Sequence, residues 1–304
     1  MPSSLLLVDA LGIAYRAFYA ITGLTTAAGQ PTNAVYGFIK TIMQMERIWR
    51  PSHKLVVFDG GVPAERLEML ATYKAQRPAM PGALRAQLPL IEAWLDTAAI
   101  AHVRLAGQEA DDVVASVAVQ AVAAGLDVLV ASSDKDLLQL VTLPATCGLQ
   151  PASLPLATPT IAIVLPGKAH EKIGPAEVLA KMGVRPDQVV DALALTGDSA
   201  DNIPGVPGIG AKTAAKLLQQ WPSLTDAFEH VDAIEPEKTR QALKEHRELI
   251  ARNQKMLRLH TDINCGASLA DMQARPPDTR RLLAFYEEME FNTLANALRE
   301  PTLF

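Results

Sequence analysis

Short apolar runs alternate with longer stretches of helical period along the first 140 residues. The apolar runs cover residues 5–8, 54–58, 102–105 and 127–131. Between them, apolar side chains recur at helical spacing over residues 36–47, 84–95 and 112–124. The last stretch stops at Gly125, a residue type that often ends helices. This order predicts an α/β fold, a mostly parallel sheet with helices on both faces.

The pattern changes in the second half of the chain. Residues 142–170 are rich in Pro, Thr and Ala, with one strand-like run at 161–165, and predict a hairpin-like excursion or a long loop. The chain is then mostly helical, apart from a turn-rich segment at 197–210, and residues 279–304 predict one or two closing helices. We therefore expect three parts: an α/β domain over 1–172, a helical domain over 173–264 and C-terminal helices over 265–304.

Composition narrows the class of protein. With 304 residues, 49% hydrophobic and 20% charged, the chain buries sizeable cores, which excludes disordered and collagen-like structure. The first apolar run is interrupted at once by Asp9, and no run reaches the roughly 18 residues of a membrane-spanning helix, so we expect no secretory signal and no membrane anchor. Cys147 and Cys265 stand alone, which predicts reduced thiols in a cytoplasmic protein rather than a disulfide scaffold.

Acidic residues follow the predicted strands. Because the carboxyl ends of parallel strands meet at one edge of a sheet, acids at these ends converge although they are far apart in sequence. Two further acids, 198 and 201, repeat a three-residue offset found between 109 and 112. The nine candidates are Asp9, Asp59, Glu109, Asp111, Asp112, Asp134, Asp136, Asp198 and Asp201.

These acids are better explained as a set than one at a time. A single Asp at a strand end often only caps the next helix. Many carboxylates gathered on one edge would repel one another unless cations neutralised them. Oxygen ligands without His or Cys favour Mg²⁺ or Mn²⁺. Two such ions suit in-line displacement at phosphorus, so phosphodiester hydrolysis is the leading chemistry.

A glycine-rich hairpin is the most specific local signal. Closely spaced glycines let backbone N–H groups approach an anion, and the helix that follows Gly210 presents its N-terminus to phosphate. Such a hairpin grips a nucleic-acid backbone without reading bases. It is not a nucleotide-binding P-loop, because the glycine-to-lysine spacing differs. The residues expected to hold the backbone are Gly205, Gly208, Gly210, Lys212, Thr213 and Lys216.

A second basic stretch follows the acid at position 59. Lys74 and Arg77, three residues apart, are candidates to stabilise charge on a scissile phosphate, and Tyr73 is a candidate to stack on an unpaired base. Arg66, in the same stretch, and Arg16, just beyond the first acid, are further candidates for contact with nucleic acid. Taken alone, such a stretch is more often a solvated helix face.

Net charge does not exclude a nucleic-acid partner. The chain carries 28 basic and 33 acidic residues, a net charge of −5, whereas nucleic-acid binders usually carry a basic surplus. Setting the nine site acids aside leaves 24 acidic residues against 28 basic ones. The remainder of the surface is therefore mildly basic, which is compatible with moderate, salt-sensitive binding to phosphates.

Taken in order, these motifs resemble the 5′-nuclease family, which includes the 5′-3′ exonuclease domain of bacterial DNA polymerase I and its free-standing and phage relatives. The likeness covers nearly the whole chain. It rests on Leu7-Val8-Asp9, Val57-Phe58-Asp59, Tyr73-Lys74-x-x-Arg77-Pro78, Glu109-Ala110-Asp111-Asp112, Asp134-Lys135-Asp136 and Leu195-Thr196-Gly197-Asp198-Ser199-x-Asp201-Asn202-Ile203-Pro204-Gly205.

The resemblance implies a fold and a reaction. The fold is a PIN-like α/β core with an arch around residues 62–90, joined to a SAM-fold-like helical domain with a helix-three-turn-helix motif around 190–220. The activity is that of a structure-specific 5′-3′ exonuclease or flap endonuclease, which cuts flapped, nicked or 5′-ended duplex DNA near single-strand junctions by a two-metal-ion mechanism. RNA primers on DNA are a further possible substrate, a monomer is expected, and hairpin carbonyls in relatives bind potassium.

The resemblance also assigns roles to residues. One group of acids matches those on or near the first metal ion: Asp9, Asp59, Glu109, Asp111 and Asp112. A second group matches those on or near the second ion: Asp134, Asp136, Asp198 and Asp201. Arg66, Lys74 and Arg77 match basic residues that contact the substrate at the base of the arch.

Two other functions remain open at this stage. A PIN-type ribonuclease shares the acidic edge but normally lacks both the glycine hairpin and the acid pair at 198 and 201. A non-catalytic, structure-specific DNA-binding module would not need the complete set of acids. Both are less well supported than the nuclease, and a small-molecule phosphatase would have no use for the hairpin.

Overall fold

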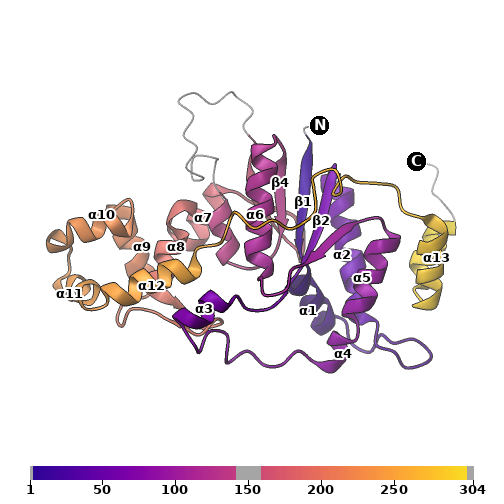
Figure 1. Cartoon of the computed structure of the whole chain (residues 1–304), viewed down its shortest axis with the longest axis horizontal. Helices are drawn as coiled ribbons and strands as arrows, with labels where there is room; N and C mark the ends of the chain where they lie inside the picture. Colours follow the sequence, from indigo (N-terminus) through magenta and orange to yellow (C-terminus); the bar gives the residue numbers. More distant parts are fainter. Residues whose placement is uncertain (1–2, 142–158, 300–304) are drawn as a thin grey trace.

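A computed structural model describes residues 3–141 and 159–299 (Figure 1). Its strands are β1 (Ser4–Asp9), β2 (His53–Phe58), β3 (Ala101–Arg104), β4 (Asp127–Ala131), β5 (Ile161–Leu165) and β6 (Lys168–Ile173). They form one sheet in the order β3-β2-β1-β4-β5-β6, in which β6 runs antiparallel to β5 and the other pairs are parallel. The parallel α/β architecture predicted from the sequence is confirmed.

Helices cover both faces of the sheet because its central strands are apolar on both sides. Leu5 and Leu7 of β1 belong to the core under α6 (Ala110–Ala123). Leu6 and Val8 point the other way, into a second core. That core is closed by α1 (Ala10–Ala20), α2 (Asn33–Trp49), α5 (Leu88–Thr97), α13 (Thr279–Glu288) and α14 (Asn292–Arg299).

The helical part lies at the opposite end of the molecule from α13 (Figure 1). It comprises α7 (Pro175–Met182), α8 (Val189–Thr196), α9 (Ala211–Gln220), α10 (Leu224–Glu229), α11 (Glu237–Glu245), α12 (Arg247–Leu257) and the short pair β7 (Gly197–Asp198) and β8 (Ile203–Pro204). Three 3₁₀ turns complete the described elements: η1 (Asp136–Leu140), η3 (Pro186–Gln188) and η4 (Val231–Ala233). The core under α6 continues between α8, α9 and α12, so the helical part is packed onto the sheet domain.

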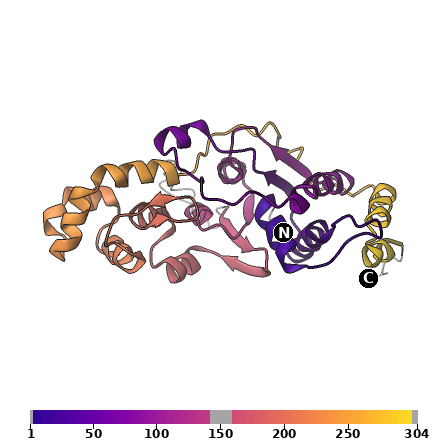
Figure 2. The same ribbon diagram turned by 90° about the horizontal axis from the view of Figure 1, so that it is seen from below.

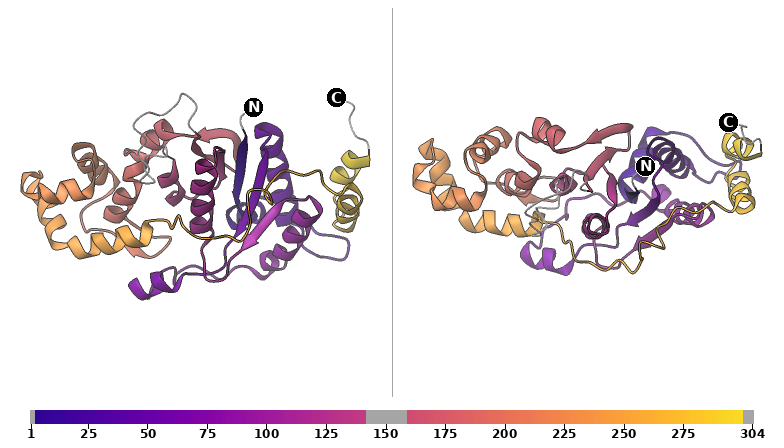
Figure 3. Two further views of the ribbon diagram at one scale, coloured as in Figure 1. Left: turned by 45° about the horizontal axis from the view of Figure 1, so that its top comes forward. Right: turned by 90° about the horizontal axis from the view of Figure 1, so that it is seen from above.

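Two long connections complete the fold. After α3 (Ala64–Met69) the chain runs beneath the sheet to α4 (Gly82–Arg85), which makes the predicted arch region (Figures 1 and 2). After α12 the chain crosses back over the sheet domain to α13 (Figure 3). This return is anchored at the sheet by a backbone hydrogen bond of 2.7 Å from the Lys54 N–H to the Met272 carbonyl.

Several local predictions differ from the structure. Helix α1 and strand β6 were not predicted: α1 follows directly on the first strand, and the polar sequence of β6 resembles a loop. Of the predicted excursion at 142–170, residues 142–158, with Cys147, lie outside the described residues, and the remainder begins the β5–β6 hairpin. Cys265 is a buried free thiol. The described helices include none long and apolar enough to cross a membrane. The domain boundaries stay predictions.

Candidate active site

The strand ends bring the first acids together at the carboxyl edge of the sheet. Asp9 ends β1 and caps α1 by accepting a hydrogen bond of 3.2 Å from the Gly12 N–H. A Cβ atom at Gly12 would lie 2.7 Å from the Asp9 carboxylate, so this approach needs glycine. Burial raises the pKa of Asp9, and the nearby carboxylates of Asp134 and Asp59 raise it further. These three acids therefore share one electrostatic site.

The start of α6 adds three acids to this edge. Burial raises the pKa of Asp111 well above its usual range, and the carboxylates of Asp134, Asp9 and Asp136 act in the same direction. Glu109 and Asp112, on either side of Asp111, are both buried. Asp111 thus joins Asp9 and Asp134 in one acidic cluster, whereas Asp112 contacts Arg66 and the His260 N–H.

A second group of carboxylates forms where the sheet meets the helical part. Asp136, Asp198 and Asp201 each place an oxygen within 4.8 Å of the other two. One oxygen of Asp136 is buried with no hydrogen-bond partner in the described structure. Such an orphaned oxygen among carboxylates fits a hard divalent cation, which takes oxygen ligands. Three residues of the second predicted metal group, Asp136, Asp198 and Asp201, therefore suit the ion that the sequence predicts.

The protonation of Asp136 sets a pH dependence for ion binding. Burial, followed by the carboxylates of Asp134, Asp198 and Asp201, raises its pKa to about 7. Below that pH the carboxyl is neutral, and a cation must displace its proton. We expect the affinity for Mn²⁺, measured by calorimetry on the whole chain, to be about tenfold weaker at pH 6 than at pH 8. An affinity that is the same at both pH values would contradict this assignment.

The acids divide into two classes by charge compensation. Four are paired with basic side chains: Glu109, Asp112, Asp198 and Asp201. The other five form no ion pair with any described residue: Asp9, Asp59, Asp111, Asp134 and Asp136. A cluster of carboxylates without basic partners carries a net negative charge and therefore attracts cations.

The two basic residues predicted to stabilise charge on the phosphate, Lys74 and Arg77, point toward the acids. Lys74 Nζ lies 2.6 Å from Glu109 Oε1 and 3.7 Å from the nearer oxygen of Asp201. Its backbone is left-handed, with φ of 54°, and its N–H donates to the Asp201 carbonyl at 3.0 Å. Arg77 forms an ion pair with the Asp201 carboxylate, while its side chain stays 48% exposed. Both cations therefore border the acids, but only Arg77 is well exposed, since the Lys74 side chain is 11% exposed.

Two residues predicted to contact nucleic acid are buried instead. Arg66 is 3% exposed and its guanidinium lies between Glu109 and Asp112. Burial acts to lower the pKa of Arg66, but the two carboxylates more than offset this, so it stays charged. Tyr73 is 5% exposed, and its hydroxyl lies 3.2 Å from Glu109 and 3.1 Å from Asp201, so its single proton is shared between the two carboxylates. In this conformation both side chains hold the acids, and neither is placed to contact DNA.

The glycine hairpin lies between β8 and α9. Gly205 packs against Thr196, where a Cβ atom would lie 2.2 Å from the carbonyl oxygen. Gly208 has a positive φ of 81°, which favours glycine. Gly210 precedes α9, and on that helix Lys212 and Lys216 are exposed four residues apart, on one face. With Thr213 half-buried beside them, the hairpin residues offer backbone and positive charge at one surface.

The remaining predicted contact, Arg16, lies on α1 and is exposed. Its guanidinium packs over Gly167, where an added Cβ atom would come within 2.1 Å of it. Arg16 is therefore on the surface close to the first acid along the helix, outside the buried network of the other site residues.

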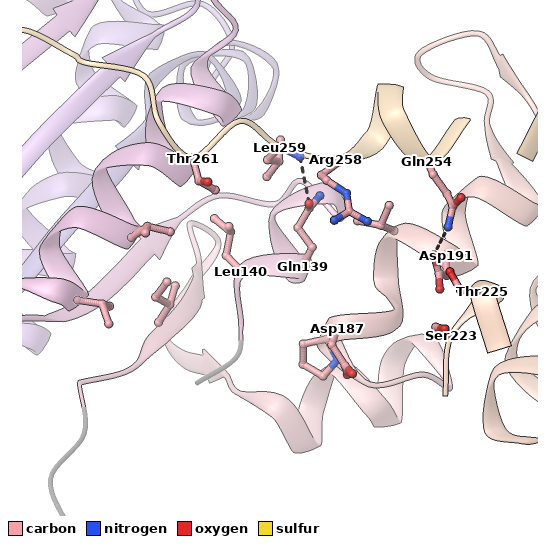
Figure 4. A pocket seen from close by; sticks show the side chains of 15 residues that line it. Gln139, Leu140, Asp187, Asp191, Ser223, Thr225, Gln254, Arg258, Leu259 and Thr261 are labelled. Atoms are coloured by element: carbon pink, nitrogen blue, oxygen red, sulfur yellow. Dashed lines mark hydrogen bonds between the residues drawn. The ribbon is translucent and has the colours of Figure 1, made fainter. Parts of the chain in front are cut away.

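A pocket of about 430 Å³ lies away from the acids, between the α6 side of the sheet domain and the helical part (Figure 4). Its polar lining includes Asp191, which accepts a hydrogen bond of 2.6 Å from Gln254, and Gln139, which accepts one from the Leu259 N–H. None of the nine acids is among the described residues that line it. It is separate from the candidate active site.

Two site residues were missed from the sequence. The Ser132 hydroxyl donates to Asp9 at 3.0 Å and accepts from the Asp134 N–H at 3.1 Å, so it joins two of the acids. Lys135 Nζ lies 3.1 Å from an Asp198 oxygen. Both lie in the segment that follows β4, beside or between Asp134 and Asp136. Their proximity to these acids in the sequence could have identified them as site residues.

Family models place this arrangement among known proteins. The model for the 5′-3′ exonuclease N-terminal resolvase-like domain matches residues 4–183, and the model for the 5′-3′ exonuclease C-terminal SAM fold matches residues 184–280. The chain belongs to the 5′-3′ exonuclease family. The resemblance noted from the motifs is thus confirmed, and so is the second domain of SAM fold.

Relatives of this 5′-3′ exonuclease family member include a protein of similar length and much longer polymerases. The 5′-3′ exonuclease of Aquifex aeolicus is 34% identical over 291 residues, which cover 96% of this chain and 93% of the relative. Thermostable DNA polymerase I of Thermus thermophilus is 38% identical over 289 residues, or 95% of this chain and 32% of the polymerase. DNA polymerase I of Bacillus subtilis is 36% identical over 299 residues, which cover 98% of this chain and 32% of the polymerase. The chain spans about a third of these polymerases.

Solved structures share the fold of this family member. The bacteriophage T5 D15 protein with metal ions aligns with a TM-score of 0.66 and 19% identity, covering 95% of this chain and 98% of that one. The T5 D15 flap endonuclease with DNA and metal ions has a TM-score of 0.65, 21% identity and the same coverage. The Rad2 catalytic core with DNA substrate has a TM-score of 0.62 and 12% identity, covering 100% and 93%.

Proposed function

We propose that this chain is a structure-specific 5′-3′ exonuclease and flap endonuclease that hydrolyses phosphodiester bonds of DNA near junctions of single and double strands. The observation that carries the proposal is a cluster of carboxylates from separate segments, in which Asp9, Asp59, Asp111, Asp134 and Asp136 form no ion pair with a described residue. The cations of Lys74 and Arg77 lie beside this cluster. Membership of the family supports the same reaction.

Two divalent ions, Mg²⁺ or Mn²⁺, fit this pocket. Asp9, Asp59 and Asp111 would hold one ion, and Asp136 with Asp198 and Asp201 would hold the other. Asp134, which the resemblance placed with the second ion, raises the pKa of Asp9, Asp111 and Asp136 alike and would lie between the two ions. When bound, such ions supply an activated water and stabilise charge on the attacking and leaving oxygens. The resemblance places Glu109 and Asp112 near the first ion as well, but their carboxylates pair with Arg66, so they would support the site without binding the ion directly. A potassium ion at the glycine hairpin stays a prediction.

Two basic side chains would stabilise negative charge on the phosphate. Lys74 and Arg77 lie at the rim of the acids and are positioned to turn toward a diester drawn over the pocket, where they share its developing negative charge. The hairpin on α9 would bind the duplex backbone at a fixed distance from the acids. The cutting position then follows from the distance between hairpin and acids.

The proposed substrates are 5′-flapped, nicked and 5′-ended duplex DNA, with RNA primers on DNA as a further substrate, and the proposed active form is a cytoplasmic monomer. Solved structures of the same fold are named as complexes with DNA, which supports a DNA substrate. Cleavage of RNA primers needs its own assay.

Product mapping on an end-labelled 5′-flap tests this function. With Mg²⁺ we expect cleavage within a few nucleotides of the junction and a 5′-phosphate on one product, and with EDTA no cleavage. A matched RNA flap separates the DNA nuclease from a PIN-type ribonuclease. Binding of the flap without cleavage at any Mg²⁺ concentration would show a non-catalytic DNA-binding module.

Lys74 should act on the reaction more than on affinity. Replacing it with glutamine removes the cation beside Glu109 but leaves the hairpin intact, so we expect kcat to fall about a hundredfold while flap affinity changes little. Single-turnover rates and equilibrium binding on the same flap measure the two effects. A fall in affinity alone, with kcat preserved, would make Lys74 a binding residue.

Lys216 should contribute to duplex binding alone. It is exposed on α9 and forms no ion pair with a described residue, so its replacement by alanine would remove one proposed phosphate contact. We expect weaker duplex binding and a salt dependence whose log–log slope is smaller by about one. Lys244→Ala is the control, since Lys244 is paired with Asp232 on another helix. An unchanged slope would exclude Lys216 from the contact.

A further inference from the structure

Lys135 is a charged residue of the pocket that the proposed reaction does not use. It lies in the turn between β4 and η1, directly between Asp134 and Asp136. Its Nζ is 3.1 Å from Asp198 Oδ1, and the Asp198 side chain is only 6% exposed. The Lys135 side chain itself is 38% exposed. A flexible cation thus reaches from solvent to one carboxylate of the second group.

We propose that Lys135 is an internal counter-cation of the Asp136, Asp198 and Asp201 group, which a divalent ion must displace in order to bind there. The inference rests on the proposed function, because it concerns the affinity of one of the two ion sites. It assigns to Lys135 the role of a positioning residue, since it acts through Asp198 and touches no reacting atom.

The argument begins with the oxygen that the ammonium occupies. Asp198 Oδ1 already accepts the Ala200 N–H at 2.9 Å and the Lys135 ammonium at 3.1 Å. A divalent cation needs the lone pairs of such oxygens, and it repels an ammonium a few ångströms away. Both effects oppose simultaneous occupancy. Lys135 and an ion at this group therefore compete.

The competition is weak enough to be reversible. Lys135 has a long, partly exposed side chain that can turn into water, where ammonium is strongly hydrated. A partly exposed ion pair contributes little, so removing Lys135 should improve ion affinity only about three- to fivefold. By contrast, Arg66 is enclosed between its acids and has no such path. Lys135, which is 38% exposed, can therefore leave its carboxylate, whereas Arg66, which is 3% exposed, cannot.

The other bases of the pocket do not replace Lys135. Lys74 and Arg77 approach Asp201 and Glu109 from the arch side, whereas Lys135 pairs with Asp198 from the segment after β4. Without Lys135, Asp198 and Asp136 would both lack an ion-pair partner in the described structure. The metal-free pocket would then carry one more uncompensated negative charge, which raises its attraction for cations.

Titration of the whole chain with Mn²⁺, followed by electron paramagnetic resonance in the absence of DNA, tests the inference. Lys135→Gln should bind one of the two ions, the one at Asp136, Asp198 and Asp201, about three- to fivefold more tightly at low salt. Lys135→Arg, which keeps the charge, should bind like the unsubstituted chain. Lys168→Gln removes an exposed lysine paired with Glu171 on β6 and is the matched control, expected to leave affinity unchanged.

Thermal melting gives a second measurement on the same variants. Metal-free Lys135→Gln should melt at a lower temperature, because its acids are less compensated, and should gain more from saturating Mn²⁺ than the unsubstituted chain does. Unchanged or weaker Mn²⁺ binding by Lys135→Gln would overturn the inference. If the unsubstituted chain bound no Mn²⁺ at millimolar concentration, the proposed function would itself be overturned, and the inference with it.

Discussion

Replacing Asp136 with alanine is expected to lower turnover on a 5′-flap at least about a thousandfold while leaving flap affinity nearly unchanged. Asp136 belongs to the carboxylate group that fits a divalent ion, and its buried oxygen has no other partner in the described structure. Losing it removes a ligand for the ion that stabilises the transition state. The hairpin that binds the duplex is untouched, so binding should persist.

Single-turnover cleavage and fluorescence anisotropy on one labelled flap separate the two effects of Asp136→Ala. Asp187→Ala is a suitable control because that acid is exposed and paired only with Arg185. It should cleave at the unsubstituted rate. Turnover within tenfold of the unsubstituted chain in Asp136→Ala would remove this residue from the metal site.

Replacing Arg66 with methionine is expected to reduce the free energy of unfolding by about 3–5 kcal/mol. The variant leaves Glu109 and Asp112 buried without their shared guanidinium, and a buried charge that loses its partner is strongly unfavourable. The shape of the side chain is roughly kept, so the loss reports on charge rather than on a cavity.

Urea denaturation without divalent ions measures the effect of Arg66→Met. Arg185→Met is the matched control, since Arg185 is half-exposed and pairs with exposed Asp187, a pair worth about 1 kcal/mol or less. Adding Asp112→Leu to Arg66→Met should recover part of the loss, because it removes one of the two stranded carboxylates. A loss below about 1 kcal/mol in Arg66→Met would mean that water or rearrangement compensates these acids.

The sequence was sufficient to predict that acids such as Asp9, Asp59 and Asp134 lie near one another at the edge of the sheet. Apolar runs such as 127–131 mark buried strands, and parallel strands place their carboxyl ends on one side regardless of strand order. This is why Asp9 and Asp134 could be brought together without knowing which strands are neighbours. The strand order itself, and the antiparallel edge strand β6, depend on packing between distant segments and carry no local signal.

Burial of the basic residues could not be predicted in the same way. Arg66 was expected to contact DNA because it matches substrate-contacting residues of the family, and Tyr73 was expected to stack on an unpaired base. The structure turns them inward because α3 packs near α12 and the segment around residue 74 is bonded to the backbone of Asp201. Which acids a cation meets is decided by these long-range contacts.

The helical part shows the same division between local and long-range information. The glycine hairpin and its lysines were evident from spacing, and the structure places Gly208 in the left-handed conformation that glycine favours. The position of that hairpin relative to the acids depends instead on the core shared by α6, α8 and α9. Apolar positions show that such a core exists, but not how its helices cross.

Crystals grown with Mn²⁺ and a short 5′-flap, with data collected near the manganese absorption edge, test the central claim most directly. We expect two anomalous peaks among these acids. One should lie beside Asp136, Asp198 and Asp201, and the other beside Asp9, Asp59 and Asp111. Peaks only elsewhere on the molecule, in a protein that still cuts the flap, would contradict the claim that these acids hold the catalytic ions.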